Sequence, residues 1–535
     1  MQPPPAQVPP VTADPTVTAP SEVPEVAQGP WPPRSRNALV AVAITCYGLV
    51  VWLPFEVHAT FFLDDLSFLE HYRLGTWFPS YRPTFRVEMG LAYRLFGSSP
   101  TGYYVLLGLL CAGTGALLYL VLRQYGLGAV PAAIAGVALI TFPRADSTAL
   151  WWSDMGGTAL FLGLGGLWLG AIWLHRSGWA LRWLVPSLLC LVAAVLCYDS
   201  LFPIVVLPAC FVLLAPDRRR LFAQVGASAV AAAGAAFYMF LTDHGTAQPT
   251  PAGHYLSRGW QLARGAWQAF VVHGFNTPSA SGSLFVLAIA GVIGVVVWAT
   301  RRRQEALEPL LPLVGTVGLL IVGGLCALVP YLPANPFYVP TLATFGNRVN
   351  VLVQVFCVCA LSLAIWVVAR LLAPRSSQLV AAVLAAAMAV VVLGGFVGQV
   401  RTDQHFYQVA GTQRAEDLAA IVRADPHPAT GSNILLGDYP TAVGPPTDVA
   451  YPTIYDQWDA AAILELQNGT ATLNVAPLNT PYRCEAGRVV LPADGVTMPY
   501  GRTVVVDVDQ GVAHPIDNAH QCAAVLPRSV TVPGS

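Results

Sequence analysis

A succession of long apolar runs constrains the fold of this chain more than any other feature. The runs lie at about 37–55, 101–122, 128–143, 156–174, 183–200, 201–215, 221–241, 283–300, 309–332, 349–369 and 378–398. Several approach the ~20 residues that a helix needs to cross a bilayer. In addition, 55% of the residues are hydrophobic and 11% are charged, whereas soluble domains have about 25% charged residues. The sequence therefore predicts an all-α polytopic membrane protein with about eleven spanning helices.

Three regions differ in composition. Residues 1–36 are Pro-rich and polar, which predicts a disordered cytoplasmic tail. Residues 37–398 hold the apolar runs and form the predicted transmembrane core. Residues 399–535 predict a small extracytoplasmic soluble domain, α/β or mostly β, with one helix at 413–423. Its predicted strands are 433–437, 487–491 and 503–508.

One part of the core is interrupted by polar residues and proline. The runs 183–200 and 201–215 are separated only by Tyr198, Asp199, Ser200 and Pro203. We interpret them as two spans joined by a tight turn. A single long re-entrant element is the alternative.

The basic residues predict the orientation of the core. All of them are arginines, because the sequence contains no lysine. With the N-terminus inside, thirteen fall on the cytoplasmic side: Arg34, Arg36, Arg123, Arg176, Arg182, Arg218, Arg219, Arg220, Arg301, Arg302, Arg303, Arg370 and Arg375. The opposite side receives mostly acids: Glu56, Asp64, Asp65, Glu70, Glu88, Asp146, Asp154, Asp199 and Asp243. The positive-inside rule then places the soluble domain outside the cytoplasm.

The side-chain inventory limits the chemistry. Without lysine, neither a Schiff base nor a Walker-type phosphate loop is available, so arginine, histidine or backbone N–H groups must hold any phosphate. The soluble domain contains two cysteines, Cys484 and Cys522, and an extracytoplasmic location favours a disulfide between them. No basic tract of the kind that binds nucleic acid is present.

Two long outer loops, 56–100 and 242–282, are the places where function is expected. The first contains the adjacent acids Asp64 and Asp65, which are costly beside a membrane unless they are used or compensated. Tyr81-Arg82-Pro83 follows, and then an amphipathic stretch that we expect to lie along the membrane interface. In the second loop, His254 begins another amphipathic stretch, which either covers a cleft or lies at the interface.

These motifs, in their order, resemble the GT-C superfamily of polytopic glycosyltransferases, especially its protein O-mannosyltransferase-like members. The resemblance covers roughly residues 37–370. It rests on the paired acids, Tyr81-Arg82-Pro83 and YRLFGSSPTGYYVLLGLL at the second span. It also includes Trp151-Trp152-Ser153-Asp154 and Gly346-Asn347-Arg348 at the heads of later spans. The chain departs from the family at Tyr104, where members often have His, and at Tyr198-Asp199, where many have Lys-Glu.

The resemblance implies transfer of a sugar from a polyprenyl-phosphate donor to a hydroxyl acceptor. The acceptor must lose a proton, which requires a carboxylate base, and Asp64 or Asp65 is the candidate, with Asp65 preferred. Adjacent helical residues point about 100° apart, so one of the pair faces the reaction centre. The other can orient an arginine, bind the acceptor or hold a divalent cation such as Mg or Mn. A helix N-cap at this pair is the structural alternative.

The leaving phosphate requires cations at the outer boundary. The candidates are Arg348, Arg82, Arg144 and Arg258, with Asp154, Asp199, Tyr81 and His254 as supporting residues. The alternative is that these arginines pair with nearby acids or reach lipid headgroups.

The sequence therefore predicts a hexosyl- or pentosyltransferase in a bacterial plasma membrane, acting at the outer face. Its expected partners are a polyprenyl-phosphate-linked sugar, membrane lipids, and an acceptor that is a cell-envelope glycan, a lipoglycan or a protein. Two other classes remain open: a transporter or lipid-carrier flippase, and a non-catalytic scaffold for envelope assembly. The charges gather at the outer boundary and no internal repeat is visible, which favours an enzyme over a transport path.

Overall fold

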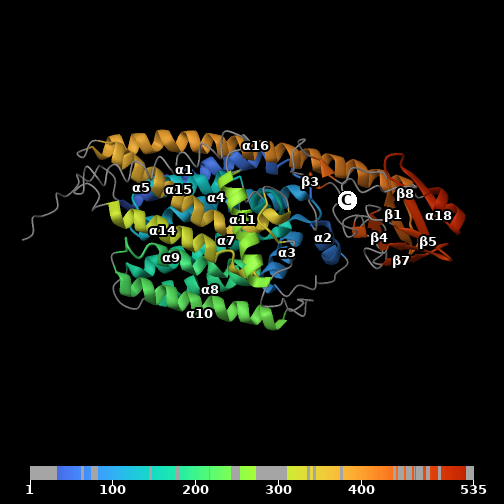
Figure 1. The fold of residues 1–535 in the computed structure, drawn as a ribbon, viewed down its shortest axis with the longest axis horizontal. Coiled ribbons are helices and arrows are strands. Elements are labelled where there is room, and N and C mark those ends of the chain that lie inside the picture. The colour runs from blue at the N-terminus through green and yellow to red at the C-terminus, as the bar shows by residue number, and fades with distance from the viewer. Residues whose placement is uncertain are drawn as a thin grey trace, which may run out of the picture.

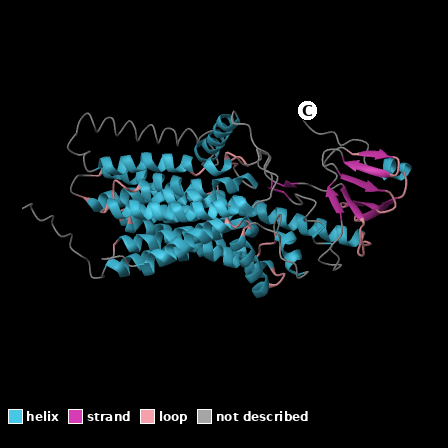
Figure 2. Ribbon diagram, turned by 90° about the horizontal axis from the view of Figure 1, so that it is seen from below, coloured by secondary structure: helices cyan, strands magenta, loops and turns pink. Residues whose placement is uncertain are grey.

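The computed structural model has a long helical bundle with a β-containing domain at one end (Figures 1 and 2). It describes residues 33–61, 65–73, 82–143, 147–175, 181–215, 217–242, 254–272, 310–333, 338–341, 345–373, 377–437, 442–443, 451–452, 461–462, 464, 474–477, 482–491 and 496–525. Expectations for residues 1–32, the span at 283–300, Asp64, Tyr81 and Arg144 lie outside this part.

Helices make up the described part of the membrane core. Its α-helices are α1 (Pro33–Glu56), α2 (Asp65–Arg73), α3 (Pro83–Phe96), α4 (Pro100–Gln124), α5 (Ala129–Thr141), α6 (Ser147–Leu150), α7 (Gly156–Leu174), α8 (Leu181–Cys197), α9 (Leu207–Cys210), α10 (Arg218–Thr242), α11 (His254–Trp267), α14 (Leu311–Cys326), α15 (Val351–Leu372) and α16 (Gln378–Ala424). Short 3₁₀ helices are η1 (Trp152–Asp154), η2 (Asp199–Val206), η5 (Val329–Tyr331) and η6 (Phe345–Asn350), and α11 continues into a π-helical turn at Gln268–Val272.

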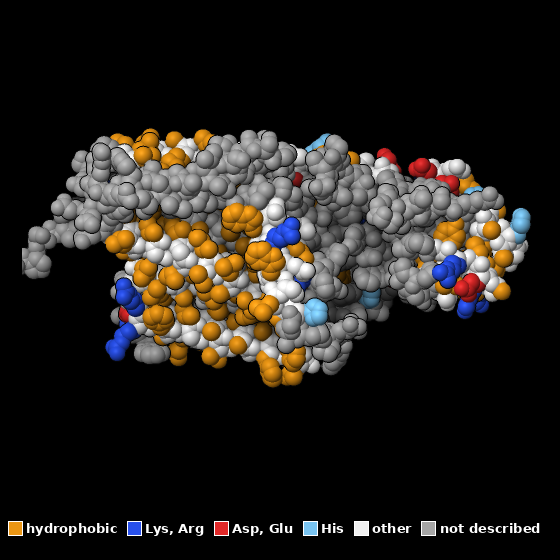
Figure 3. Space-filling view, in the orientation of Figure 1, with side chains coloured by type: hydrophobic (Ala, Val, Ile, Leu, Met, Phe, Trp, Pro, Cys, Tyr) orange, Lys and Arg blue, Asp and Glu red, His pale blue; other side chains and the backbone are white. Residues whose placement is uncertain are grey.

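Seven of the described helices are long and apolar enough to cross a membrane, which agrees with the predicted polytopic class. They are α1, α4, α7, α10, α16 and the two helices that contain α14 and α15. Figure 3 shows hydrophobic side chains spread over one face of the bundle, as a lipid-facing surface requires. The exact number of spans, predicted as about eleven, stays a prediction.

The stretch after α8 differs from the expected full span. Residues 199–206 form η2, and α9 adds only four residues before the chain turns. Pro203 and Pro208 lack the N–H that a continuous α-helix needs, which explains why no long α-helix forms here. This segment brings Tyr198 and Asp199 to the same end of the bundle as η1 and η6.

Predicted cytoplasmic loops meet at one end of the bundle. His175 Nε2 lies 2.8 Å from the carbonyl oxygen of Gln124, and Arg220 Nη1 donates to the carbonyl of Leu174 at 3.2 Å. Arg123 Nη1 donates to the carbonyl of Leu127. The ends of α4, α7 and α10 at Gln124, Leu174 and Arg220 therefore lie together.

Helix α16 is longer than the sequence indicated. The predicted span at 378–398 and the predicted helix at 413–423 belong to one helix of 47 residues. No proline interrupts residues 399–412, and the helix continues through Gly411, the one glycine in this stretch. At about 1.5 Å per residue it is roughly 70 Å long, more than twice the ~30 Å hydrocarbon core. It thus connects the bundle to the C-terminal domain (Figure 1).

The described part of the C-terminal domain contains three sheets. The strands are β1 (Asn433–Gly437), β2 (Ala442–Val443), β3 (Tyr451–Pro452), β4 (Asn474–Pro477), β5 (Arg483–Glu485), β6 (Arg488–Leu491), β7 (Val496–Pro499), β8 (Thr503–Asp507) and β9 (Val512–Ile516), followed by α18 (Ala519–Val525). In the order β4-β1-β8-β9, β1 runs parallel to β4 and β8, and β9 runs antiparallel to β8. The sheet β5-β6-β7 and the pair β2-β3 are antiparallel. The predicted strands correspond to β1, β6 and β8, and the predicted disulfide Cys484–Cys522 joins β5 to α18.

Candidate active site at one end of the bundle

The turn between α6 and α7 shapes the site. Met155 has φ 56° and ψ 0°, and among the described residues it is the one non-glycine with a positive φ. A bulky residue in the left-handed region costs about 1–3 kcal/mol, and such strain often accompanies functional sites. Directly before it lies Asp154, which is 3% exposed. A Cβ on Gly157 would lie 2.6 Å from the carbonyl oxygen of Thr148, so glycine allows α7 to start this close to α6.

Asp65 anchors the first outer loop to this turn. It is the first residue of α2 and is 1% exposed. Its Oδ1 accepts the backbone N–H of Ser153 at 2.9 Å, and its Oδ2 accepts the hydroxyl of Tyr104 at 2.8 Å. Both oxygens of this carboxylate are therefore engaged in holding η1 and α4, while its neighbour Asp64 lies outside the described residues.

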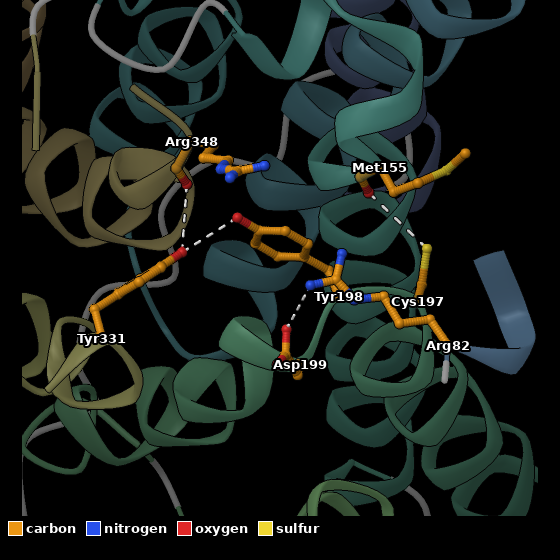
Figure 4. A network of polar contacts seen from close by, with 7 residues as sticks. All are labelled: Arg82, Met155, Cys197, Tyr198, Asp199, Tyr331 and Arg348. Carbon is orange, nitrogen blue, oxygen red and sulfur yellow. Dashed lines mark hydrogen bonds and ion pairs between the residues drawn. The ribbon is translucent and has the colours of Figure 1, made fainter. Parts of the chain in front are cut away.

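A second cluster surrounds Tyr198, as Figure 4 shows. Arg82 Nη2 lies 3.2 Å from Asp199 Oδ1, and its guanidinium carbon lies 5.2 Å from the Tyr198 ring centroid. The hydroxyls of Tyr198 and Tyr331 are 3.3 Å apart, and Tyr331 donates to the carbonyl of Arg348 at 3.5 Å. Tyr198 also lies within electrostatic range of Asp154 and of the Arg348 side chain. Two guanidinium groups from distant parts of the chain thus converge on one tyrosine.

Aromatic rings hold the Arg348 side chain. Its guanidinium carbon lies 4.5 Å from the ring centroid of Tyr338 and 5.7 Å from that of Trp151. Contact with aromatic rings restricts the position of a guanidinium group. The N–H groups at its edge point away from the ring faces and can bind an anion. Arg348 comes from η6 and Trp151 from the turn before α7, so the two later motifs identified in the sequence meet here.

Arg258 and His254 have other surroundings. Arg258 is 5% exposed, its Nη2 donates to the carbonyl of Tyr338 at 2.6 Å, and its Nη1 donates to Gln261 Oε1 at 3.4 Å. Burial lowers the pKa of its guanidinium. Arg258 thus holds the residue whose ring contacts Arg348, and the structure does not bring it into the Tyr198 cluster. His254 is the exposed first residue of α11.

Glu88 is a candidate that we did not single out from the sequence. Its Oε1 accepts the hydroxyl of Thr158 at 2.6 Å, and its Oε2 lies 3.8 Å from Cys197 Sγ. Burial raises the pKa of its carboxyl to about 7. Helical spacing could have identified it, because position 88 shares a face with the buried residues Phe85, Met89 and Ala92.

The described residues do not form a cluster of metal ligands. Within them, no three His, Cys, Asp or Glu side chains lie close enough to hold a metal ion together. Asp65 uses both oxygens on protein donors. We therefore derive no step through a divalent cation.

The fold and this cluster define a multi-pass membrane protein with a charged, aromatic-lined site at one end of its helices. Scans against protein-family models and curated sequences find no match. Among solved structures, the chain is similar to an oligosaccharyltransferase from Archaeoglobus fulgidus in complex with zinc and sulfate, with a TM-score of 0.43 and 12% identity over 82% of this chain and 62% of that one. It is also similar to ArnT from Cupriavidus metallidurans in the apo state, with a TM-score of 0.39 and 16% identity over 75% of this chain and 82% of that one. The chain thus spans less than two thirds of the archaeal protein. Both similarities are in backbone fold and do not identify a substrate.

Proposed function

We propose that this protein is a GT-C-type glycosyltransferase. It moves a hexosyl or pentosyl group from a polyprenyl-phosphate donor to a hydroxyl acceptor, which is a cell-envelope glycan, a lipoglycan or a protein. The observation that carries the proposal is the convergence of Arg82 and Arg348 on Tyr198, beside the buried Asp154 and the loop anchored by Asp65.

The two guanidinium groups suit a leaving phosphate. Guanidinium forks match phosphate oxygens and stay charged at any physiological pH. The Arg82 side chain is 24% exposed and that of Asp199 is 40% exposed. Ion pairs with this exposure contribute roughly 0–1 kcal/mol, so a phosphate can replace Asp199 on Arg82. Arg144 stays a candidate outside the described residues.

The acids of the first outer loop supply the base. Since Asp65 is buried with both oxygens engaged, we assign it the role of positioning the loop, and we assign proton removal to Asp64. In the reaction, the acceptor oxygen bonds to the anomeric carbon and its proton passes to the Asp64 carboxylate. The bond from that carbon to the phosphate oxygen breaks, and polyprenyl phosphate leaves with the electron pair.

We place the protein in a bacterial plasma membrane with the N-terminus in the cytoplasm and the C-terminal domain outside. Arginines gathered at one end of the bundle support this orientation. The Cys484–Cys522 disulfide supports an oxidising compartment for the C-terminal domain. A C-terminal alkaline phosphatase fusion should therefore be active, and an inactive fusion would reverse the assignment.

The direct test uses the full chain in lipid nanodiscs with radiolabelled polyprenyl-phosphate sugars and a cell-envelope extract. Sugar should move to the extract, with Asp64→Asn reducing the rate about 100-fold or more. Glu416→Gln, which changes an exposed acid on α16, is the matched control. Absence of transfer by the native protein contradicts the proposal. If the labelled lipid crosses the membrane of reconstituted vesicles and no sugar is transferred, the protein is a flippase instead.

A further inference from the structure

Two side chains of α16 reach across a seam to the backbone of α1. Pro54 within α1 has no N–H to donate to the carbonyl of Val50. From α16, Arg401 Nη2 donates to that carbonyl at 3.5 Å, and Gln404 Nε2 donates to the carbonyl of Val51 at 3.2 Å. The seam continues past the end of α1, where a Cβ on Gly411 would lie 2.3 Å from Thr60 Oγ1. The two segments are thus held together on both sides of the gap described next.

A cavity of about 380 Å³ opens in this seam. Phe55 and Tyr407 supply rings to it, and Leu150 and Ala59 are also apolar. Four polar residues complete the lining: His58, Thr60, Gln408 and Thr412. They are exposed, so the cavity is accessible from outside. Pockets of about 300–1,000 Å³ are the usual size for small organic ligands.

The lining favours a neutral polyhydroxyl ligand. Hydroxyl, amide and imidazole groups both donate and accept hydrogen bonds, as sugar hydroxyls require. Ring faces suit the apolar faces of a pyranose or furanose. The eight described residues that line the cavity include neither arginine nor a carboxylate. This composition disfavours a phosphate or an ammonium ligand, which need an opposite charge.

The cavity is next to the segment that contacts Arg348 and Asp65. Leu150, which lines it, directly precedes Trp151, whose ring contacts Arg348. Two residues further on, the N–H of Ser153 bonds to Asp65. Within the segment 150–153, Leu150 lines the cavity and Trp151 contacts Arg348. Ser153 of the same segment binds Asp65. A ligand in the cavity is therefore close to the segment that Asp65 anchors, without occupying the charged cluster around Tyr198.

We propose that the cavity between α1 and α16 is the acceptor subsite and binds a neutral saccharide. This assignment rests on the proposed glycosyl transfer and extends it, because it selects a glycan among the acceptor classes. Arg82 and Arg348 hold the donor phosphate, while Gln408, Thr412 and Thr60 hold the acceptor sugar.

Binding is tested with the full chain in nanodiscs by saturation-transfer NMR. The probes are trisaccharides of glucose, galactose and mannose, with inositol hexakisphosphate as the charged comparator. At least one trisaccharide should bind. Thr412→Trp, which fills the cavity, should weaken binding about tenfold or more. Thr402→Trp, at an exposed position of α16 outside the lining, is the control and should bind normally. Gln408→Leu provides a second test that adds no bulk.

The outcomes separate this inference from the proposed function. Thr412→Trp and Gln408→Leu should raise KM for the acceptor, whereas Thr402→Trp, outside the lining, should leave it unchanged. If sugar transfer occurs but neither variant changes acceptor KM, the subsite assignment is wrong and the transferase stands. If a trisaccharide binds and both variants weaken it while no transfer occurs, the saccharide site stands and the transferase is wrong. Binding of the charged comparator alone, or of no probe, overturns the assignment.

Discussion

Two tyrosines at the end of the bundle that holds η1 and η6 are surrounded by charged groups of different kinds. Around Tyr198, Arg82 and Asp199 are partly exposed and paired with each other. Around Tyr104, the charges are almost completely buried: Glu56 is 0%, Asp65 1% and Arg414 3% exposed. Partly exposed charges can exchange partners at low cost, whereas buried ones cannot. We infer that the Tyr198 cluster binds ligand and that the Tyr104 cluster fixes geometry.

The largest effect on activity is expected from removing Arg348, whose guanidinium lies against the rings of Tyr338 and Trp151. Arg348→Ala should lower kcat/KM for the donor about 1,000-fold, the loss of roughly 4 kcal/mol of stabilisation on the leaving phosphate. Arg348→Lys keeps the charge without the fork and should recover part of the rate. Arg264→Ala, an exposed arginine of α11, is the control. Equal loss in both alanine variants would mean that Arg348 has no special role.

The Tyr104 cluster should respond in stability instead. Glu56 Oε1 and Oε2 and Arg414 Nη1 and Nη2 have no hydrogen-bond partner among the described residues, and both side chains interact electrostatically with Tyr104. We expect the two groups to share the buried charge around Tyr104, so that removing one leaves the other uncompensated at a cost of about 3 kcal/mol. Glu56→Gln and Arg414→Gln should each lower the unfolding temperature, and the double variant should lose less than their sum.

The matched control for that cycle is Arg423→Gln, at an exposed position further along α16. It should leave the unfolding temperature unchanged. If the losses of the two buried variants simply add, Glu56 and Arg414 do not compensate each other. The Tyr104 cluster would then not be stabilised by a pair of buried charges.

Glu88 lies between the two behaviours, because it is buried but hydrogen-bonded to Thr158. With a pKa of about 7 in the folded protein, above its ordinary 4.5, it keeps its proton more readily when folded. Its contribution to stability is therefore full below pH 4.5 and is lost as the pH rises to about 7. Glu88→Gln should reduce the fall in unfolding temperature between pH ~5 and ~7.5, whereas Glu416→Gln should not.

Local patterns in the sequence predicted the elements but not how they meet. The apolar runs, strands β1, β6 and β8 and the Cys484–Cys522 pair follow from composition and alternation. The Tyr198 cluster does not, because Arg82 and Asp199 are separated by 117 residues and only helix packing joins them. Nor did composition show that α16 continues through its polar middle. Polar residues end an apolar run, but only proline, glycine or capping residues end a helix.

The smallest expected effect concerns the ion pair between Arg82 and Asp199. In a double-mutant cycle with Arg82→Gln and Asp199→Asn, the coupling free energy of stability should be below about 1 kcal/mol, because both side chains are partly exposed. Activity should respond unequally: Arg82→Gln removes a phosphate ligand and should raise donor KM about tenfold, whereas Asp199→Asn frees the guanidinium and should lower it. A rise of donor KM in both variants would show that Asp199 positions Arg82 rather than competing with the phosphate, and the pair would then belong with the fixed charges around Tyr104.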